Sequence, residues 1–360
     1  MKKTILLVIV LIMLISLSGC RDTSNIVNAK IIGLVETDVG INSEYHLSLR
    51  ISEGGYKGEV VQVSFMPIKF SQFDFTPEIG KTLIISVEKI DNNIYPTIVG
   101  ISRKNHLLVL FLIFFGLLLI FGRKQGLLSI IALALSGLIL FFFLIPMVLK
   151  GHNVLVFTVL SAVAIVSISF VVLCGITRKS LASILGTVGG IISAVIISEL
   201  FCRLSGITGS VSEEAYQLVC ENGVEIDFAG LFISGIIIGT IGVVMDVSMS
   251  ITSTIFEFKN HSPKIQKKQL ISCGLNVGKD IMATMINTLI LAYVGTSMPL
   301  LFVFFSNASS LKYVISTELV AGEIIRSLCG SIGLILTVPL TSLIASYLAT
   351  GTVRLRRYRR

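Results

Sequence analysis

The chain alternates between long apolar runs and short polar, often basic, connections. The apolar runs are long enough to cross a bilayer, whose hydrocarbon core of about 30 Å takes about 20 helical residues. They lie at residues 107–122, 127–149, 154–176, 181–206, 228–250, 281–305 and 322–350. This pattern predicts a polytopic α-helical membrane domain with seven spans.

Residues 28–103 follow a different pattern, in which apolar and polar residues alternate. Tyr45, Leu47, Leu49 and Ile51 are separated by polar residues, as in a strand with one buried face. A turn at residues 53–56 and further alternating segments give about five strands. We expect a small all-β domain, closed as an OB-like barrel because closure removes exposed sheet edges.

The first twenty residues have the layout of an export signal. Lys2 and Lys3 precede an apolar segment at residues 5–17 that is short for a span, and Cys20 ends a sequence similar to a lipobox. Cleavage with lipidation of Cys20 and an uncleaved signal anchor both stay open. The predicted order is signal or anchor (1–20), extracytoplasmic β domain (21–104), seven-helix membrane domain (105–353) and basic cytoplasmic tail (354–360).

Composition and charge support a membrane protein. Apolar residues make up 53% of the chain and charged residues only 14%, with a mean hydropathy of +0.90, which excludes a soluble domain. The net charge of +8 is spread over short clusters between spans, which indicates topology rather than a nucleic-acid partner. The predicted cytoplasmic clusters are Arg123, Lys124, Arg178, Lys179, Lys259, Lys264, Lys267, Lys268, Lys279 and the arginines of the tail.

Four polar residues at or inside the predicted spans are costly in hydrocarbon and are the candidate site. Asp246 lies toward the inner end of the fifth span, Lys279 and Asp280 open the sixth, and Asn287 is two turns deeper. Two interpretations stay open. The four residues form a polar cluster that lines a pathway or an ion site, or Asp246 reaches the cytoplasmic interface or caps a broken helix.

Two further pairs of charged residues are spaced to neutralise each other on a helix. Glu199 and Arg203 are four residues apart near the predicted outer face, and Glu323 and Arg326 are three apart in the last span. The spacing favours structural ion pairs.

Glycines four residues apart recur in the fourth and fifth spans. Gly186 with Gly190, and Gly235 with Gly239, fit close helix packing. A hinge or a role in permeation is the alternative.

Catalytic and metal chemistry find little support, so we expect neither an enzyme nor a metal or other cofactor. The four histidines have no metal-ligand spacing, and Asp280 stands where a phosphate loop after Gly274 would need Ser or Thr. Cys202 and Cys220 both fall near the predicted outer face, where a disulfide is an open question.

Several motifs resemble the YibE/F family of bacterial membrane proteins. They are Gly242–Ser250, Gly274–Met282, Asn287–Tyr293 and the segment from Glu323 to Thr341. The resemblance implies a multi-pass protein of the bacterial plasma membrane. Members of this family are often taken to be permeases, but their substrate is not established.

Two functions follow from these features. One is a permease for a small solute or ion, with a pathway formed by the last three spans. The other is a non-transporting envelope scaffold or sensor, anchored in the lipid bilayer, whose exported β domain binds a protein partner.

Overall fold

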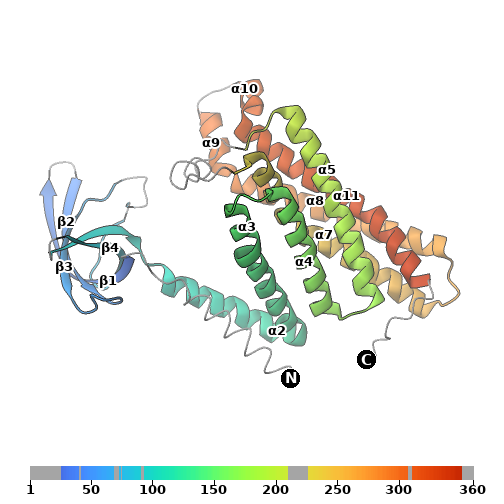
Figure 1. Cartoon of the computed structure of the whole chain (residues 1–360), viewed down its shortest axis with the longest axis horizontal. Helices are drawn as coiled ribbons and strands as arrows, with labels where there is room; N and C mark the ends of the chain where they lie inside the picture. Colours follow the sequence, from blue (N-terminus) through green and yellow to red (C-terminus); the bar gives the residue numbers. More distant parts are fainter. Residues whose placement is uncertain are drawn as a thin grey trace. The chain divides into compact units, whose positions relative to one another are not determined.

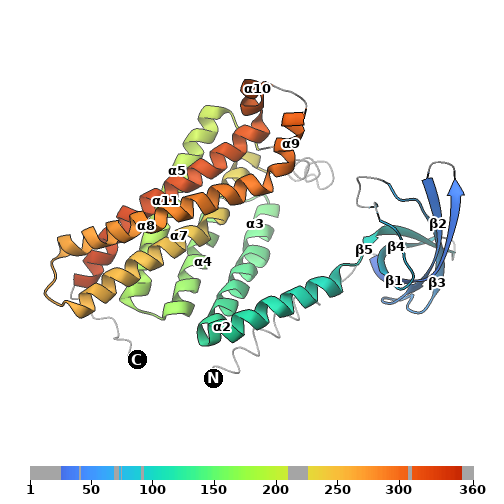
Figure 2. The same cartoon turned by 180° about the vertical axis from the view of Figure 1, so that it is seen from behind.

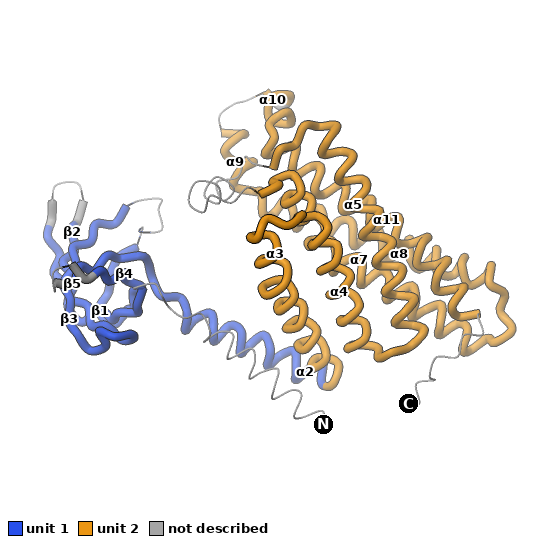
Figure 3. The backbone as a smooth tube through the Cα atoms, in the orientation of Figure 1, with its two compact units in different colours: residues 1–123 blue, residues 124–360 orange. Residues whose placement is uncertain are grey.

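The computed structural model divides the chain into two compact units, Met1–Arg123 and Lys124–Arg360 (Figure 3). It describes residues 26–39, 42–68, 73, 75–90, 93–209, 226–306 and 310–350. The predicted signal with Cys20, the partner cysteine Cys220 and the basic tail lie outside the described residues.

Unit 1 contains a five-stranded antiparallel sheet. Its strands are β1 (Ile26–Val39), β2 (Asn42–Ile51), β3 (Val60–Phe65), β4 (Thr82–Ile90) and β5 (Asn93–Ile101). They are ordered β3-β2-β1-β4-β5 across the sheet.

Alternation along β2 places one of its faces in the core of this sheet. Tyr45, Leu47, Leu49 and Ile51 are buried and the intervening side chains are more exposed. The predicted turn after β2 is present, and Gly54 adopts the left-handed region there with φ of 81°. The prediction of an all-β domain is therefore confirmed.

The sheet curls so that its two edge strands, β3 and β5, approach each other. Hydrogen-bonded pairing runs from β3 through β2, β1 and β4 to β5 and does not join β5 back to β3 within the described residues. The domain is thus a β half-barrel, which is less closed than the predicted OB-like barrel.

The remainder of the described chain is helical, as Figures 1 and 2 show. The helices are α2 (Lys104–Ile139), the π-helix η1 (Leu140–Leu144), α3 (Ile145–Leu149), α4 (Val154–Cys174), α5 (Arg178–Ser205), α7 (Phe228–His261), α8 (Lys267–Thr296), α9 (Met298–Ser306), α10 (Leu311–Ser316) and α11 (Glu318–Thr350).

The last long helix, α11, is the centre of unit 2. It packs against α5, α7 and α8, and α4 packs against α5 and α7. In the most apolar stretch of α11 56% of the residues are buried, the highest share among the long helices. Because α7 and α8 contact each other and both contact α11, they lie side by side on one face of this bundle (Figure 2).

Among the described residues, six helices are long and apolar enough to cross a membrane. The prediction of a helical domain with several helices that could span a membrane is confirmed, but its count of seven is not. The difference lies in Lys104–Leu149, a stretch of 46 residues that holds the first two predicted spans. The backbone leaves the helical region there at Arg123, with φ of 47° and ψ of −121°.

The helices in the region of the fifth and sixth predicted spans have other bounds than those spans. Helix α7 continues to His261 and α8 begins at Lys267, so residues 262–266 alone connect them. A capping box between Gln266 and Gln269 starts α8, and a separate helix, α9, follows its end at Thr296. Asp246 therefore lies in the middle of α7, and Lys279 and Asp280 lie in the middle of α8.

Candidate functional site

The outer face of α8 is polar along much of its length. Asn276, Asp280, Thr284 and Asn287 are all exposed and recur every three or four residues, so they share one side of the helix. Lys279 is also exposed beside this row. We call these five residues the polar face of α8.

The opposite side of α8 carries glycines that allow close packing. A Cβ atom on Gly274 would meet Ile255 of α7 and Ser342 of α11 at 2.7 Å and 2.8 Å. A Cβ atom on Gly278 would overlap Val338 of α11. These contacts turn the polar face away from the bundle.

Asp246 projects from the exposed side of α7, next to α8. The helices run antiparallel, with Ile251 opposite Gly278 and Gly239 opposite Tyr293. This register places Asp246 level with Thr284, within about one helical turn of the levels of Asp280 and Asn287. The hairpin therefore brings the predicted residues to similar depths on adjacent helices.

These polar side chains are exposed and have no partner in the described part of the chain. No hydrogen bond or ion pair joins Asp246, Lys279, Asp280 or Asn287 to another described residue. Inside a bilayer, such groups need water or another protein surface.

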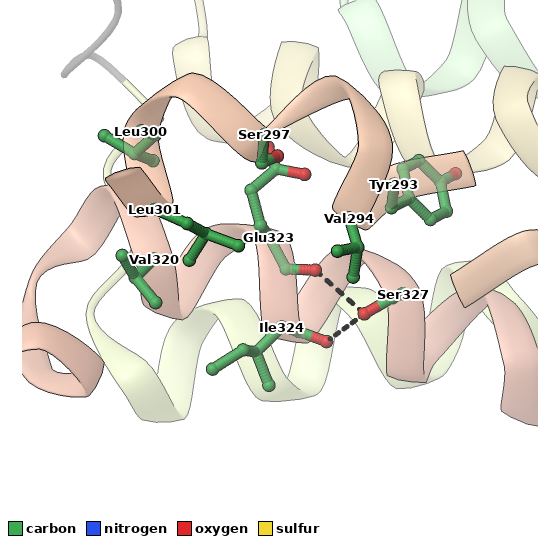
Figure 4. A pocket seen from close by; sticks show the side chains of 9 residues that line it. All are labelled: Tyr293, Val294, Ser297, Leu300, Leu301, Val320, Glu323, Ile324 and Ser327. Atoms are coloured by element: carbon green, nitrogen blue, oxygen red, sulfur yellow. Dashed lines mark hydrogen bonds between the residues drawn. The ribbon is translucent and has the colours of Figure 1, made fainter. Parts of the chain in front are cut away.

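A second group of polar side chains gathers where α8, α9 and α11 meet. A cavity of about 90 Å³ lies there, lined by Tyr293, Val294, Ser297, Leu300, Leu301, Val320, Glu323, Ile324 and Ser327. In Figure 4 the side chain of Glu323 extends toward Ser297, while the hydroxyl of Ser327 donates to the backbone oxygens of Glu323 and Ile324. A volume of this size is large enough to hold several water molecules.

Glu323 and Arg326 form an ion pair beside this cavity. Arg326 Nη1 lies 3.1 Å from Glu323 Oε1, and the guanidinium lies 4.9 Å from the centre of the Phe232 ring. Three buried atoms of the group have no hydrogen-bond partner among the described residues, namely Glu323 Oε2, Arg326 Nε and the Tyr293 hydroxyl. The pair is thus only partly satisfied.

The other predicted ion pair is more exposed. Arg203 Nε donates to Glu199 Oε1 at 2.7 Å near the end of α5, and 79% of the Arg203 side chain is accessible. It lies apart from both polar groups and needs no role beyond local pairing.

Sequence reasoning missed Tyr293 and Asn276. Tyr293 stands within an apolar run, and its importance comes from Gly239, whose lack of a side chain leaves room for the phenol hydroxyl. Asn276 lies outside the predicted spans, although its spacing of four from Asp280 is a helical signal in the sequence.

Within the described ranges, no three His, Cys, Asp or Glu side chains are grouped so as to hold a metal ion. Cys202 is buried in the helical core, and its bridge to Cys220 stays a prediction because Cys220 lies outside those ranges.

Comparison with known proteins identifies a family but no individual relative. A search of curated proteins and a search of solved structures give no significant match. The family model described as YibE/F-like protein matches residues 110–351, which cover α8 with its polar face, Asp246 and the ion pair of α11. Since this match spans more than half of the sequence, the chain belongs to the YibE/F-like family of proteins.

Proposed function

We propose that this protein is a permease that moves a small solute or ion along the polar face of α8 and past Asp246. The observation that carries the proposal is the row of unpartnered polar side chains on helices that are apolar enough to cross a bilayer. In hydrocarbon each such group costs several kcal/mol. A water-filled pathway hydrates these side chains and so removes the cost of placing them in hydrocarbon. It also gives the polar row of α8 a role in transport.

The topology we propose has seven spans. A straight helix of 46 residues would be about 69 Å long, more than twice the hydrocarbon thickness. The bend at Arg123 allows the two halves of this stretch to cross separately. The β domain then lies outside the bacterial plasma membrane, where we propose that it completes an OB-like barrel.

The distribution of basic residues supports this orientation. The connection between α4 and α5 and the connection between α7 and α8 lie at the same end of unit 2 (Figure 1). Arg178 and Lys179 flank the first, and Lys264, Lys267 and Lys268 flank the second. Positive charge accumulates on the cytoplasmic side of membrane proteins, so this end faces the cytoplasm.

Flux into proteoliposomes tests the proposal. The purified protein is reconstituted and a gradient is imposed for each member of a panel of cations, anions and amino acids. We expect flux of at least one of these solutes for the natural sequence and a loss of at least about tenfold for Asp246→Asn and for Asp280→Asn. Each substitution removes one charge from the pathway while conserving side-chain size.

Glu199→Gln is the matched control, because it also removes a carboxylate from a long helix but at a residue with its own partner, Arg203. Its flux should equal that of the natural sequence. Absence of flux for every solute, with folded and oriented protein, would overturn the permease. Equal losses in all three variants would show that the site is elsewhere.

A second candidate function is that of an envelope scaffold or sensor, which a groove on the β domain favours. The groove has a volume of about 290 Å³ and lies between the edge strands, lined by residues of β3 and β5 together with Met66, Ile68 and Phe73. Met66 and Ile68 are exposed there. An extended peptide could occupy such a gap between two strands.

If the scaffold function is correct, Met66→Asp should reduce capture of an envelope protein by at least about tenfold and leave flux unchanged. The measurement is cross-linking in intact cells followed by identification of the captured proteins. Val35→Asp is the control, because Val35 is also apolar, is more exposed (62% against 42% for Met66) and is not among the residues that line the groove. Identical capture by both variants would exclude the groove as the binding site for an envelope protein.

A further inference from the structure

The polar face of α8 is poorly covered for a helix in a membrane. Only 11% of the most apolar stretch of α8 is buried, compared with 44% for each of α4, α5 and α7. Its packed side contacts α7 and α11, and its polar face contacts no other described element of unit 2. Lipid tails supply no hydrogen-bond partners, so a second protein surface must separate this face from lipid.

The long apolar segments of this chain cannot satisfy the polar face. Residues 107–121 of α2 and residues 298–305 of α9 are entirely apolar in their side chains. Leucine and phenylalanine side chains neither donate nor accept hydrogen bonds, so they cannot partner Asn276, Asp280 or Asn287. A surface with matching polar groups at the same depth is required.

We propose that this surface is the same face of α8 in a second copy of the chain. Two copies with the same membrane topology are related by a two-fold axis along the bilayer normal, which sets each α8 beside its counterpart at equal depth. This proposal rests on the proposed function in one respect, that α8 crosses the bilayer. It gives the exposed polar row a protein partner, and the solute pathway then runs beside this contact, between Asp246 of α7 and Thr284 at the margin of the polar face.

The order of residues around α8 fits this symmetry. At about 100° per residue, Asn276, Ala283 and Asn287 lie within about 20° of one line along the helix. An asparagine amide both donates and accepts, so each asparagine can bond its own symmetry copy. Ala283 is small and exposed between them, which lets the two helices approach closely.

The charges are complementary across the same axis. Lys279 lies about 60° to one side of this line and Asp280 about 40° to the other side. Neighbours in sequence do not face each other on a helix, which agrees with the absence of an ion pair between them in the described chain. The two-fold axis sets Lys279 of each copy opposite Asp280 of the other, so two ion pairs form and all four charges are neutralised.

Charge reversal in trans tests the pairing. Lys279→Asp and Asp280→Lys are each expressed alone and then together with two different affinity tags. Each variant alone sets like charges across the axis, and we expect its self-association to fall at least about tenfold. When the two variants are co-expressed, both facing pairs become opposite in sign, so the mixed dimer should recover to the level of the natural sequence.

Cysteine cross-linking in native membranes provides a second readout. In a chain without its natural cysteines, Ala283→Cys should form a covalent dimer on oxidation. Ile196→Cys is the control, because Ile196 is 62% exposed but belongs to α5, which does not pack against α8. Cross-linking at both positions would indicate random collision and overturn the proposal.

The outcomes separate this inference from the proposed function. A monomer for the natural sequence, or no recovery by the mixed pair, overturns the two-fold interface even if flux is present. A dimer that shows the expected recovery but transports none of the solutes supports the interface and rejects the permease.

Discussion

Replacing Gly190 by alanine is expected to lower the free energy of unfolding of the helical unit by about 1–3 kcal/mol, the usual cost of an overpacked core. A Cβ atom at this position of α5 would overlap the hydroxyl of Thr337 on α11 and crowd Val244 of α7. Thr337 cannot turn aside freely, because it is fully buried and its hydroxyl donates to Gly333 at 2.8 Å. Leucine at position 190 should prevent α5 from packing on α11 altogether.

The measurement is the apparent midpoint of thermal unfolding in detergent, followed as loss of the folded peak in size-exclusion chromatography. A loss of 1–3 kcal/mol corresponds to a decrease of about 2–12 °C for a unit of this size. Gly235→Ala on α7 is the control, since a Cβ atom there meets nothing within 4 Å. Alanine is the better helix former, so that variant should be unchanged or slightly more stable. An unchanged midpoint for Gly190→Ala would contradict the packing interpretation.

These glycines show what spacing alone could not decide. Gly186 with Gly190 and Gly235 with Gly239 have the same separation, which places each pair on one side of its helix. The structure sets Gly186 and Gly190 against Thr341 and Thr337 but leaves Gly235 open. Which side of a helix is covered depends on helices distant in sequence.

Strand and helix positions were predictable to different degrees for a physical reason. In unit 1 one side of the sheet is buried and the other is exposed to solvent, so the alternation of Leu47 and Leu49 with polar residues reveals the strand. Hydropathy finds an apolar run but not a helix that continues through polar residues. It therefore placed the start of the sixth span at Ile281, although α8 begins at Lys267.

Hydropathy also could not predict the central position of α11 in the bundle. Lipid and protein interior are equally apolar, so an apolar helix at the centre of a bundle resembles one at its edge. The distinguishing signal was the abundance of small and hydroxyl-bearing residues in the last helix. Its buried polar residues are Ser327, Ser331, Thr337, Thr341, Ser342 and Ser346.

The candidate site was predictable in its residues but not in its environment. The sequence singled out Asp246 and Asp280 because carboxylates are rare in spans. It could not show that both are exposed, and for Asp280 the exposure depends on the glycines that hold the other side of α8 against Ile255 and Val338. The partner of the polar face is therefore a question that only the packing raises.

Replacing Arg326 by alanine is expected to cost about 3 kcal/mol of stability, because it leaves the carboxylate of Glu323 without its counter-ion. The two side chains are only 29% and 26% exposed, and Glu323 Oε2 already lacks a hydrogen-bond partner among the described residues. The substitution also removes the cation from the ring of Phe232. The apparent thermal midpoint should fall by about 6–12 °C.

Two comparisons isolate the uncompensated charge as the cause. Arg203→Ala breaks a pair of the same type, but its side chain is 79% exposed, and we expect a loss of at most about 1 kcal/mol. The double variant Glu323→Leu with Arg326→Leu removes both charges, so it should be more stable than Arg326→Ala although it lacks more polar contacts. If the double variant instead loses as much stability as Arg326→Ala or more, the ion pair contributes through packing, and the charge of Glu323 is already satisfied by water in the adjoining cavity.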